Sequence, residues 1–518
     1  MTGIFGCSLP EWADNGLKLG PNYQAPAAGI AENWIDSDDP QVLECPPSYV
    51  NWWAVYQDPV LEHLIETAYQ QNLSVREAGW RIVQARAQRA IVVGDLFPQD
   101  QFLNGGYTRR QISDLAQPLL VPEPEFRRSF DNWLYGGKLS WELDVWGRFR
   151  RSVESADAGL DASVAEYDAI LISLIAEVAT TYIEIRTLEQ RLEYAQKNVR
   201  TQEESLRLTK TRAEEGKTAD VSVHLAKSNL ASTKATIPSL EIGLRQANNR
   251  LCTLLGFPTS DLHYMLGDGT IPPPPAQVAV GIPADLLRRR PDVRAAERRV
   301  AAQSAQIGVA LANLYPSISI TGEIVVTAEN FSDLSNSLSW GGSIGPSFRW
   351  NFLNYGRLIS NVHLQNARLQ ELITTYQNTV LVANEEVESA LVSYLRTQRQ
   401  VVSLSESAQE TKRALELELL RFQEGETDFS GVFVLQGDLA LKQDQLATAQ
   451  GRVASSLAEV YKALGGGWEI SCREVYEHPG EYSEEFVLSP IEETGEIVPP
   501  QPTPRLDAET SMSDLPEN

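Results

Sequence analysis

Internal repetition is the feature that most restricts how this chain can fold. Residues 75–98 (VREAGWRIVQARAQRAIVVGDLFP) align without a gap with residues 293–316 (VRAAERRVAAQSAQIGVALANLYP), which lie 218 positions later. Residues 141–148 (WELDVWGR) align with residues 350–357 (WNFLNYGR) at an offset of 209. The sequence therefore predicts two copies of one structural unit, and an interpretation of one copy has to suit the other.

The change of offset locates an insertion in the first copy. Nine extra residues lie between Pro98 and Trp141, and we place them in the proline-rich segment 117–126 (QPLLVPEPEF). Length differences between related units collect in surface loops. Because strand-like segments flank this insert, we expect a hairpin loop that faces outside.

Each copy opens with a predicted helix that runs into a strand. The helices are expected at 55–95 and 284–313, and the apolar-aromatic pair that follows each one precedes Pro98 or Pro316. Proline cannot continue a helix, so both helices should end there and extended chain should begin.

Four segments alternate apolar and polar residues and are predicted strands: 97–109, 131–146, 315–327 and 340–353. Such alternation fits either a soluble sheet or the wall of a membrane barrel. The many aromatic residues in and next to these segments favour the barrel, because membrane barrels carry girdles of aromatic side chains at both membrane surfaces. These aromatic residues are Trp133, Tyr135, Trp141, Trp146, Trp340, Trp350 and Tyr355.

Very long helices follow the strands in both copies. Residues 148–215 contain one glycine and no proline, and residues 357–424 contain neither. At about 1.5 Å per residue each would extend about 100 Å, so each needs a partner along its length. Apolar residues recur every three or four positions, as in a coiled coil. Return helices are expected at 219–255 and 428–464, with Pro238 bending the first.

Short turns join each long helix to its return helix, near 214–220 and 423–429. A glycine in each turn, Gly216 or Gly425, suits a left-handed helix C-cap. A threonine in each turn stands where an N-cap restarts the chain. The expected N-caps are Thr218 and Thr427.

The chain divides into five parts, of which the second and fourth are the repeats. An N-terminal lipoprotein-like and equatorial segment (1–54) precedes the first repeat (55–256), and a proline-rich linker (257–283) leads to the second repeat (284–467). The acidic, proline-rich tail (468–518) is expected to be disordered. The formal net charge of −25 argues against a nucleic-acid partner, because phosphate binding requires clustered Lys and Arg.

Chemistry-bearing motifs are missing from the sequence. The four cysteines form no CxxC pair and the five histidines are scattered singly, so neither a metal nor a cofactor is expected. GxSxG, HExxH, P-loop and GxGxxG motifs do not occur. The carboxylates fall on solvated helix faces, and we therefore do not expect an enzyme.

The segment GIFGCS around Cys7 is similar to the end of a lipoprotein signal, in which the cysteine becomes the acylated first residue. Neither a charged region nor a full apolar region precedes it. Two interpretations stay open: Cys7 carries lipid, here palmitate, or it is an ordinary thiol.

Four strands cannot close a barrel. An open sheet edge in lipid leaves backbone N–H and C=O groups unpaired, at a cost of several kcal/mol each. If the strands lie in a membrane, two, three or four copies must combine into eight, twelve or sixteen strands. Barrels of about twelve strands or more can hold an aqueous lumen, and the helices would continue the wall as a tube.

Several separate stretches resemble the TolC-like outer-membrane factors, in particular the lipoprotein branch that serves resistance–nodulation–division pumps. These are residues 285–322, which open DLLRRRPDVRAAERRV, residues 19–26 (LGPNYQAP), 141–148 and 230–256. The resemblance implies a mainly α protein with membrane β-structure and an outer-membrane homotrimer with a twelve-strand barrel. A periplasmic coiled-coil tunnel, an adaptor protein and an inner-membrane pump would complete the efflux system.

The resemblance also places function at the periplasmic tip. In the first copy Asp220 stands at the position of the family's tip aspartate. In the second copy, Arg421 and the segment GETDF (425–429) place Asp428 and Phe429 in the family's tip turn. A ring of carboxylates at a constriction repels anions, and Arg–Asp pairs between neighbouring hairpins would hold it shut. Val434 stands where the family often has an aspartate, and Asp438 lies one turn later as a substitute. The alternative role of these residues is helix capping.

A periplasmic helical scaffold or adaptor without a membrane barrel is the competing interpretation. It would make the strands a soluble sheet, whereas the channel requires detergent and a shared barrel. The cargo stays open among drugs, dyes, solvents, metals and proteins.

Overall fold

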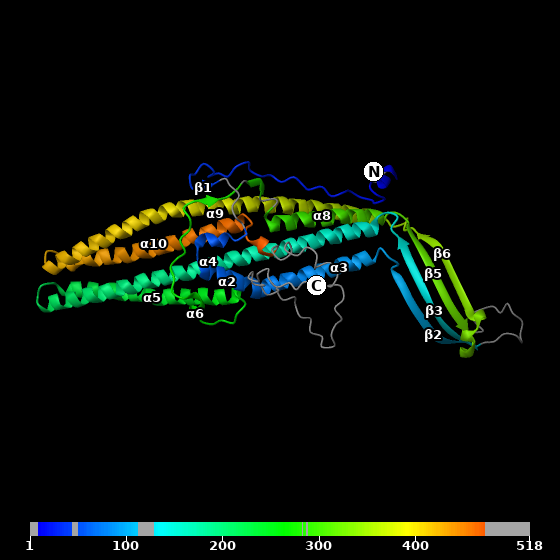
Figure 1. The fold of residues 1–518 in the computed structure, drawn as a ribbon, viewed down its shortest axis with the longest axis horizontal. Coiled ribbons are helices and arrows are strands. Elements are labelled where there is room, and N and C mark those ends of the chain that lie inside the picture. Colours follow the sequence, from blue (N-terminus) through cyan, green and yellow to red (C-terminus); the bar gives the residue numbers. More distant parts are fainter. Residues whose placement is uncertain (1–8, 44–49, 112–128, 282, 286–288, 472–518) are drawn as a thin grey trace, which may run out of the picture.

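This elongated molecule is dominated by two long helical hairpins and a four-stranded sheet at one end (Figure 1). The computed structural model describes residues 9–43, 50–111, 129–281, 283–285 and 289–471. The expected fold class is confirmed: the chain is mainly helical, with two repeats that each contain two strands and long helices. Cys7, the insert at 117–126 and the tail from residue 472 lie outside the described residues.

The hairpins account for most of the length. In the first, α4 (Arg148–Glu214) is followed by α5 (Asp220–Leu254), which contains Pro238. In the second, α9 (Arg357–Glu424) is followed by α10 (Phe429–Ala463). α10 packs against both α9 and α4, so the two hairpins lie side by side (Figure 1).

A single helix over 55–95 was the wrong expectation. The chain forms the 3-10 helix η1 (Trp52–Tyr56), then α2 (Pro59–Gln71) and α3 (Leu73–Gly94). Asn72 causes the break: its side chain accepts hydrogen bonds from the backbone N–H groups of Ser74 and Val75 and donates to Leu254 O at 2.8 Å. One asparagine thus caps a new helix and fastens it to α5.

The corresponding helix of the second copy starts later than expected. α8 spans Pro291–Ala312, with Pro291 in its first turn, and Pro283–Asp285 form the separate 3-10 helix η2. Proline is favoured at the start of a helix, where its missing N–H costs nothing.

The sheet is antiparallel throughout, with strand order β2-β3-β5-β6. Its strands are β2 (Asp100–Gln111), β3 (Ser129–Leu143), β5 (Ser317–Ala328) and β6 (Trp340–Arg349). Two 3-10 helices, η3 (Phe331–Ser335) and η4 (Ser337–Ser339), join β5 to β6.

β3 ends three residues before the expected boundary at 146. The carboxylate of Asp144 accepts hydrogen bonds from the backbone N–H groups of Phe149 and Arg150, at 2.9 and 3.0 Å. Gly147 adopts a left-handed conformation with φ of 78° and starts α4. This capped turn replaces the last strand residues and directs α4 away from the sheet.

The core lies midway along the helices, where α2, α4, α9 and α10 meet. Trp52 stacks on Tyr461 at 5.3 Å between ring centroids, and both are buried. The guanidinium of Arg186 is buried as well and donates to the carbonyls of Leu266 and Gly267. We call the region around this core the equator. Its short elements are β1 (Val42–Leu43), α6 (His263–Leu266), β4 (Val278–Ala279) and η5 (Trp468–Ser471).

An N-terminal strap runs along the outside of α8 and α9 from the sheet to the equator (Figure 1). It begins with α1 (Leu9–Asp14) and reaches β1, which pairs in parallel with β4. Arg151 in α4 holds the strap by donating to Leu19 O at 3.0 Å and to Gly20 O at 2.9 Å. Among the described residues, no helix combines the length and apolar character needed to cross a bilayer.

Candidate functional site: the membrane sheet and the periplasmic tip

Aromatic side chains lie near both ends of the sheet. At the end far from the helices, Trp133 packs on Tyr107 at 4.6 Å and on Phe331 at 5.1 Å between ring centroids. Near the helices, Trp146 stacks on Tyr315 at 4.7 Å. Trp133 and Trp141 are eight residues apart on β3, which corresponds to about 26 Å of strand. The apolar band of outer-membrane barrels is about 25 Å tall.

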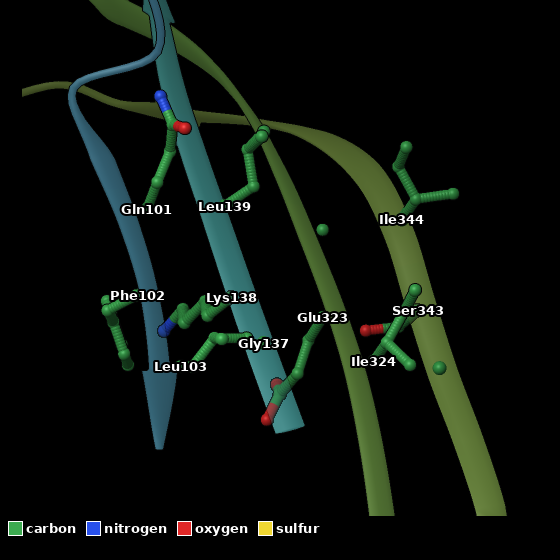
Figure 2. A pocket seen from close by; sticks show the side chains of 12 residues that line it. Gln101, Phe102, Leu103, Gly137, Lys138, Leu139, Glu323, Ile324, Ser343 and Ile344 are labelled. Carbon is green, nitrogen blue, oxygen red and sulfur yellow. The ribbon is translucent and has the colours of Figure 1, made fainter.

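Between these aromatic groups, one face of the sheet is apolar and hollowed (Figure 2). The hollow has a volume of about 710 Å³, and its apolar walls are Leu103, Leu139, Ile324 and Ile344. Three glycines, Gly137, Gly322 and Gly342, lie between these side chains in the strand register. This face suits hydrocarbon.

The opposite face is mainly polar on β3, β5 and β6, whereas β2 places Phe102 in the same row as Lys138. Lys138, Glu323 and Ser343 are register partners in one row across β3, β5 and β6. Side chains of successive residues alternate between faces, so this row points away from the apolar walls. One face that suits lipid and one that suits water are what a section of barrel wall requires.

Both edges of the described sheet lack a partner strand, since β2 and β6 are its outermost members. Within a bilayer these edges have to pair with other copies. A membrane sheet with two open edges, carrying long helical hairpins, defines one subunit of an oligomeric channel.

The hairpin tips differ between the copies. Asp428 is the N-cap of α10 and accepts a hydrogen bond from the backbone N–H of Ser430 at 2.8 Å. The hydroxyl of Ser430 also donates to this carboxylate, and the hydroxyl and backbone hydrogen bonds together lower the pKa of the Asp428 carboxyl. In the first copy the N-cap is Ala219, which has no capping side chain, and Asp220 is the first residue of α5.

The expected threonine caps were therefore wrong: Asp428 takes the position given to Thr427, and Ala219 takes that given to Thr218. The glycine expectation holds in geometry, since Gly216 and Gly425 have φ of 70° and 83°. In the second copy the Asp428 carboxylate accepts the capping hydrogen bond, and the hydroxyl of Thr427 has no hydrogen-bond partner among the described residues.

From the resemblance we expected four residues of the second hairpin to act together at the tip. In the structure these residues, Arg421, Asp428, Phe429 and Asp438, have different surroundings. Arg421 pairs with Glu426 at 3.4 Å and with Glu418 at 3.5 Å. Phe429 is fully buried against Phe422, at 5.6 Å between ring centroids. Asp438 lies further along α10 and accepts from Thr411 Oγ1 at 3.4 Å.

Arg212 is a tip residue that the sequence reasoning missed. It donates to Gln423 O at 2.8 Å, and its guanidinium lies 5.0 Å from the centre of the Phe422 ring. It thereby joins the first hairpin to the second within one protomer. The signal was present, because the offset of 209 places Arg212 opposite Arg421 in the repeat alignment.

The family model described as Outer membrane efflux protein matches residues 64–257 and 282–466. The chain is 32% identical to nodulation protein T of Rhizobium leguminosarum bv. trifolii, over 88% of this chain and 95% of that protein. It is 30% identical to the pyoverdine export outer membrane protein OpmQ of Pseudomonas putida, covering 90% and 96%.

Solved structures agree with these relatives. The outer-membrane channel OprN superimposes with a TM-score of 0.80 at 30% identity, covering 87% of this chain and 99% of that chain. The open state of the Neisseria gonorrhoeae MtrE outer membrane channel gives a TM-score of 0.73 at 26% identity, covering 88% and 99%.

The chain belongs to the outer membrane efflux protein family. It is an outer-membrane channel of tripartite efflux systems, extends into the periplasm and is not an enzyme. Channels of this family form trimers in efflux complexes.

Proposed function

We propose that this chain forms a lipid-anchored homotrimeric outlet that serves a resistance–nodulation–division pump through a periplasmic adaptor. The outlet is closed at its periplasmic tip until the adaptor docks. Relatives are named for export of pyoverdine and of toluene, so the proposed cargo is small organic molecules. The observation that supports the trimer is a difference in burial between α3 and α8, which are equivalent helices of the two repeats.

Helices α3 and α8 are equivalent in the repeat but differ in burial. α8 has twelve buried residues out of 22, because it lies between α4 and α9. α3 also has 22 residues but only two of them are buried, because it packs on α4 alone among the long helices. The repeat is completed if α9 of a neighbouring protomer covers α3. The same neighbour would pair its β6 with β2, and the other neighbour would pair its β2 with β6.

The strap supports the lipid anchor. α1 begins two residues after Cys7, and its Trp12 donates to Val145 O at 3.2 Å and lies 5.6 Å from the Trp146 ring. Both contacts are at the end of the sheet nearer the helices, where Trp146 stacks on Tyr315. A palmitate analogue supplied to cells should label the wild-type protein and fail to label Cys7→Ala; equal labelling of both would refute the anchor.

The tip supports a charged constriction. Asp220 and Asp428 are both exposed at the first turn of a return helix, so a trimer brings six carboxylates to one end of the tunnel. Arg421 is exposed too and is free to reach a neighbouring hairpin in addition to Glu418 and Glu426. Val434 is 62% exposed and adds no charge.

Single-channel conductance in planar bilayers tests the gate. Arg421→Ala and Asp428→Ala should both raise conductance, because they loosen the tip. Asp428→Ser is the matched control, since serine keeps the N-cap and removes only the charge. A gate predicts higher conductance for Asp428→Ser as well. A rise in Asp428→Ala alone would assign Asp428 to capping, and no change in any variant would refute the gate.

A further inference from the structure

The first and second hairpins of one protomer meet along α4 and α10, which run antiparallel; we call this contact the α4–α10 seam. Two hydrogen bonds between uncharged side chains fix its register in the half nearer the tip, where Arg191 of α4 also pairs with Asp444 of α10 at 2.7 Å. Asn198 Nδ2 donates to Gln443 Oε1 at 2.9 Å, and Gln436 Nε2 donates to Ser205 Oγ at 2.7 Å. Each bond joins one polar residue of α4 to one of α10.

The same register defines the neighbouring layers of the seam. Ala195 lies opposite Leu446 on the equatorial side, and both are 9% exposed. Thr209 lies opposite Val432 on the tip side, and both are fully buried. The hydroxyl of Thr209 is satisfied within α4, because it donates to Ser205 O at 2.7 Å. These layers therefore match polar with polar groups, or leave only apolar contact.

One layer is mismatched. Midway between the two hydrogen-bonded pairs, the register places Gln202 of α4 opposite Leu439 of α10. Gln202 is 2% exposed, and neither atom of its amide has a hydrogen-bond partner among the residues that the structure describes. Leu439 is 7% exposed and belongs to the apolar cluster near the tip. A water molecule trapped there would still face leucine methyl groups, so full hydration of the amide requires the helices to part.

We propose that the α4–α10 seam is built to open at the Gln202–Leu439 layer, and that this mismatch sets how readily the two hairpins of a protomer separate. A buried amide without a partner disfavours the closed seam by about tenfold in its equilibrium. The hydrogen-bonded layers on both sides can exchange their partners for water when the seam parts, while Leu439 leaves the apolar cluster near the tip. This inference rests on the proposed gate at the tip.

The layer can be repaired in two chemically opposite ways. Gln202→Leu makes an apolar pair with Leu439, and Leu439→Gln makes an amide pair like that of Asn198 and Gln443. Each variant should lower the open probability in planar bilayers by roughly tenfold and raise the thermal unfolding midpoint. The double variant inverts the mismatch and should return towards wild type on both measurements. Gln409→Leu, at an exposed position on α9, is the matched control and should change neither.

The pattern across the four variants decides the inference. It is refuted if either single variant leaves open probability unchanged, or if the double variant is more closed than both single variants. Circular dichroism and trimer elution confirm folding, and if Gln202→Leu misfolds, Leu439→Gln carries the test alone. Asp428→Ser in the same bilayers separates the two proposals. If it raises conductance while the repaired seams change nothing, the seam fails and the gate stands; if it too changes nothing, the gate fails.

Discussion

Asp168 is a buried carboxylate that makes the stability of this fold depend on pH. It lies on α4, is 5% exposed, and has the guanidinium of Arg294 on α8 as its charged neighbour. Burial raises the pKa of Asp168 to about 6, and Arg294 offsets only part of that effect. Arg294 also lies 5.3 Å from the ring centre of Trp468, so its charge is shared between two contacts.

Asp168→Asn should stabilise the protein at pH 7.5 by about 2–3 kcal/mol, because the neutral amide avoids burying a charge. The pKa is higher in the folded chain than in the unfolded one, so the folded state binds more protons between about pH 4 and 6. Wild-type stability should therefore fall as pH rises through that window and be level above it. Thermal midpoints of both proteins from pH 4 to 7.5 measure this slope.

Asp161→Asn is the control for that experiment, since Asp161 lies two turns earlier on α4 and is exposed. It should leave the pH dependence of the midpoint as in wild type. If Asp168→Asn keeps the wild-type slope, the buried charge is compensated by contacts that the single protomer lacks.

Elements were predicted better than their boundaries. The repeat, the proline stops and the three-to-four periodicity are local signals, and they sufficed for the strands, the hairpins and the left-handed glycines. The break at Asn72 depends on a hydrogen bond to Leu254, which is 182 positions away, so local pattern could not show it. The repeat alignment places Arg212 opposite Arg421, but its contact with Gln423 in the other repeat is a tertiary contact that the alignment does not show.

Family resemblance also placed residues by analogy where the packing differs. Phe429 was expected in the tip turn as a functional residue, and the structure buries it against Phe422. Whether Asp220, Asp428, Arg421 and Asp438 act at a gate depends on neighbouring protomers, whose contacts a sequence of one chain does not specify.

One protomer contains two copies of the repeat, and the packing of the first copy is completed only by another protomer. Gln306 on α8 donates to Ser155 Oγ on α4 at 2.8 Å. The repeat offsets convert this contact into one between Gln88 on α3 and Leu364 on α9, and both residues are exposed in the protomer. In a trimer that continues the pattern, these two positions meet across each boundary.

Cysteines placed at Gln88 and Leu364 should therefore form covalent trimers on oxidation, visible by gel electrophoresis without reductant. Each single variant is a control for the chain's own cysteines and should give no trimer. A second control pairs the cysteine at Gln88 with one at Gln409, which lies in the tip half of α9. Cross-linking of the control pair, or monomers alone from the test pair, would contradict the proposed packing.

The order of strands has a consequence for how the chain reaches its folded state. β2 and β3 are neighbours in sequence, as are β5 and β6, but the sheet is joined where Leu143 pairs with Ile318, 175 positions later. Two-stranded hairpins are marginal in isolation, and closing so long a loop is slow. The two strand pairs unite only when this long loop closes, and the outer edges of β2 and β6 stay unpaired until copies meet. Unpaired strand edges are templates for aggregation, so the open edges of β2 and β6 favour early meeting of copies over a long-lived single chain.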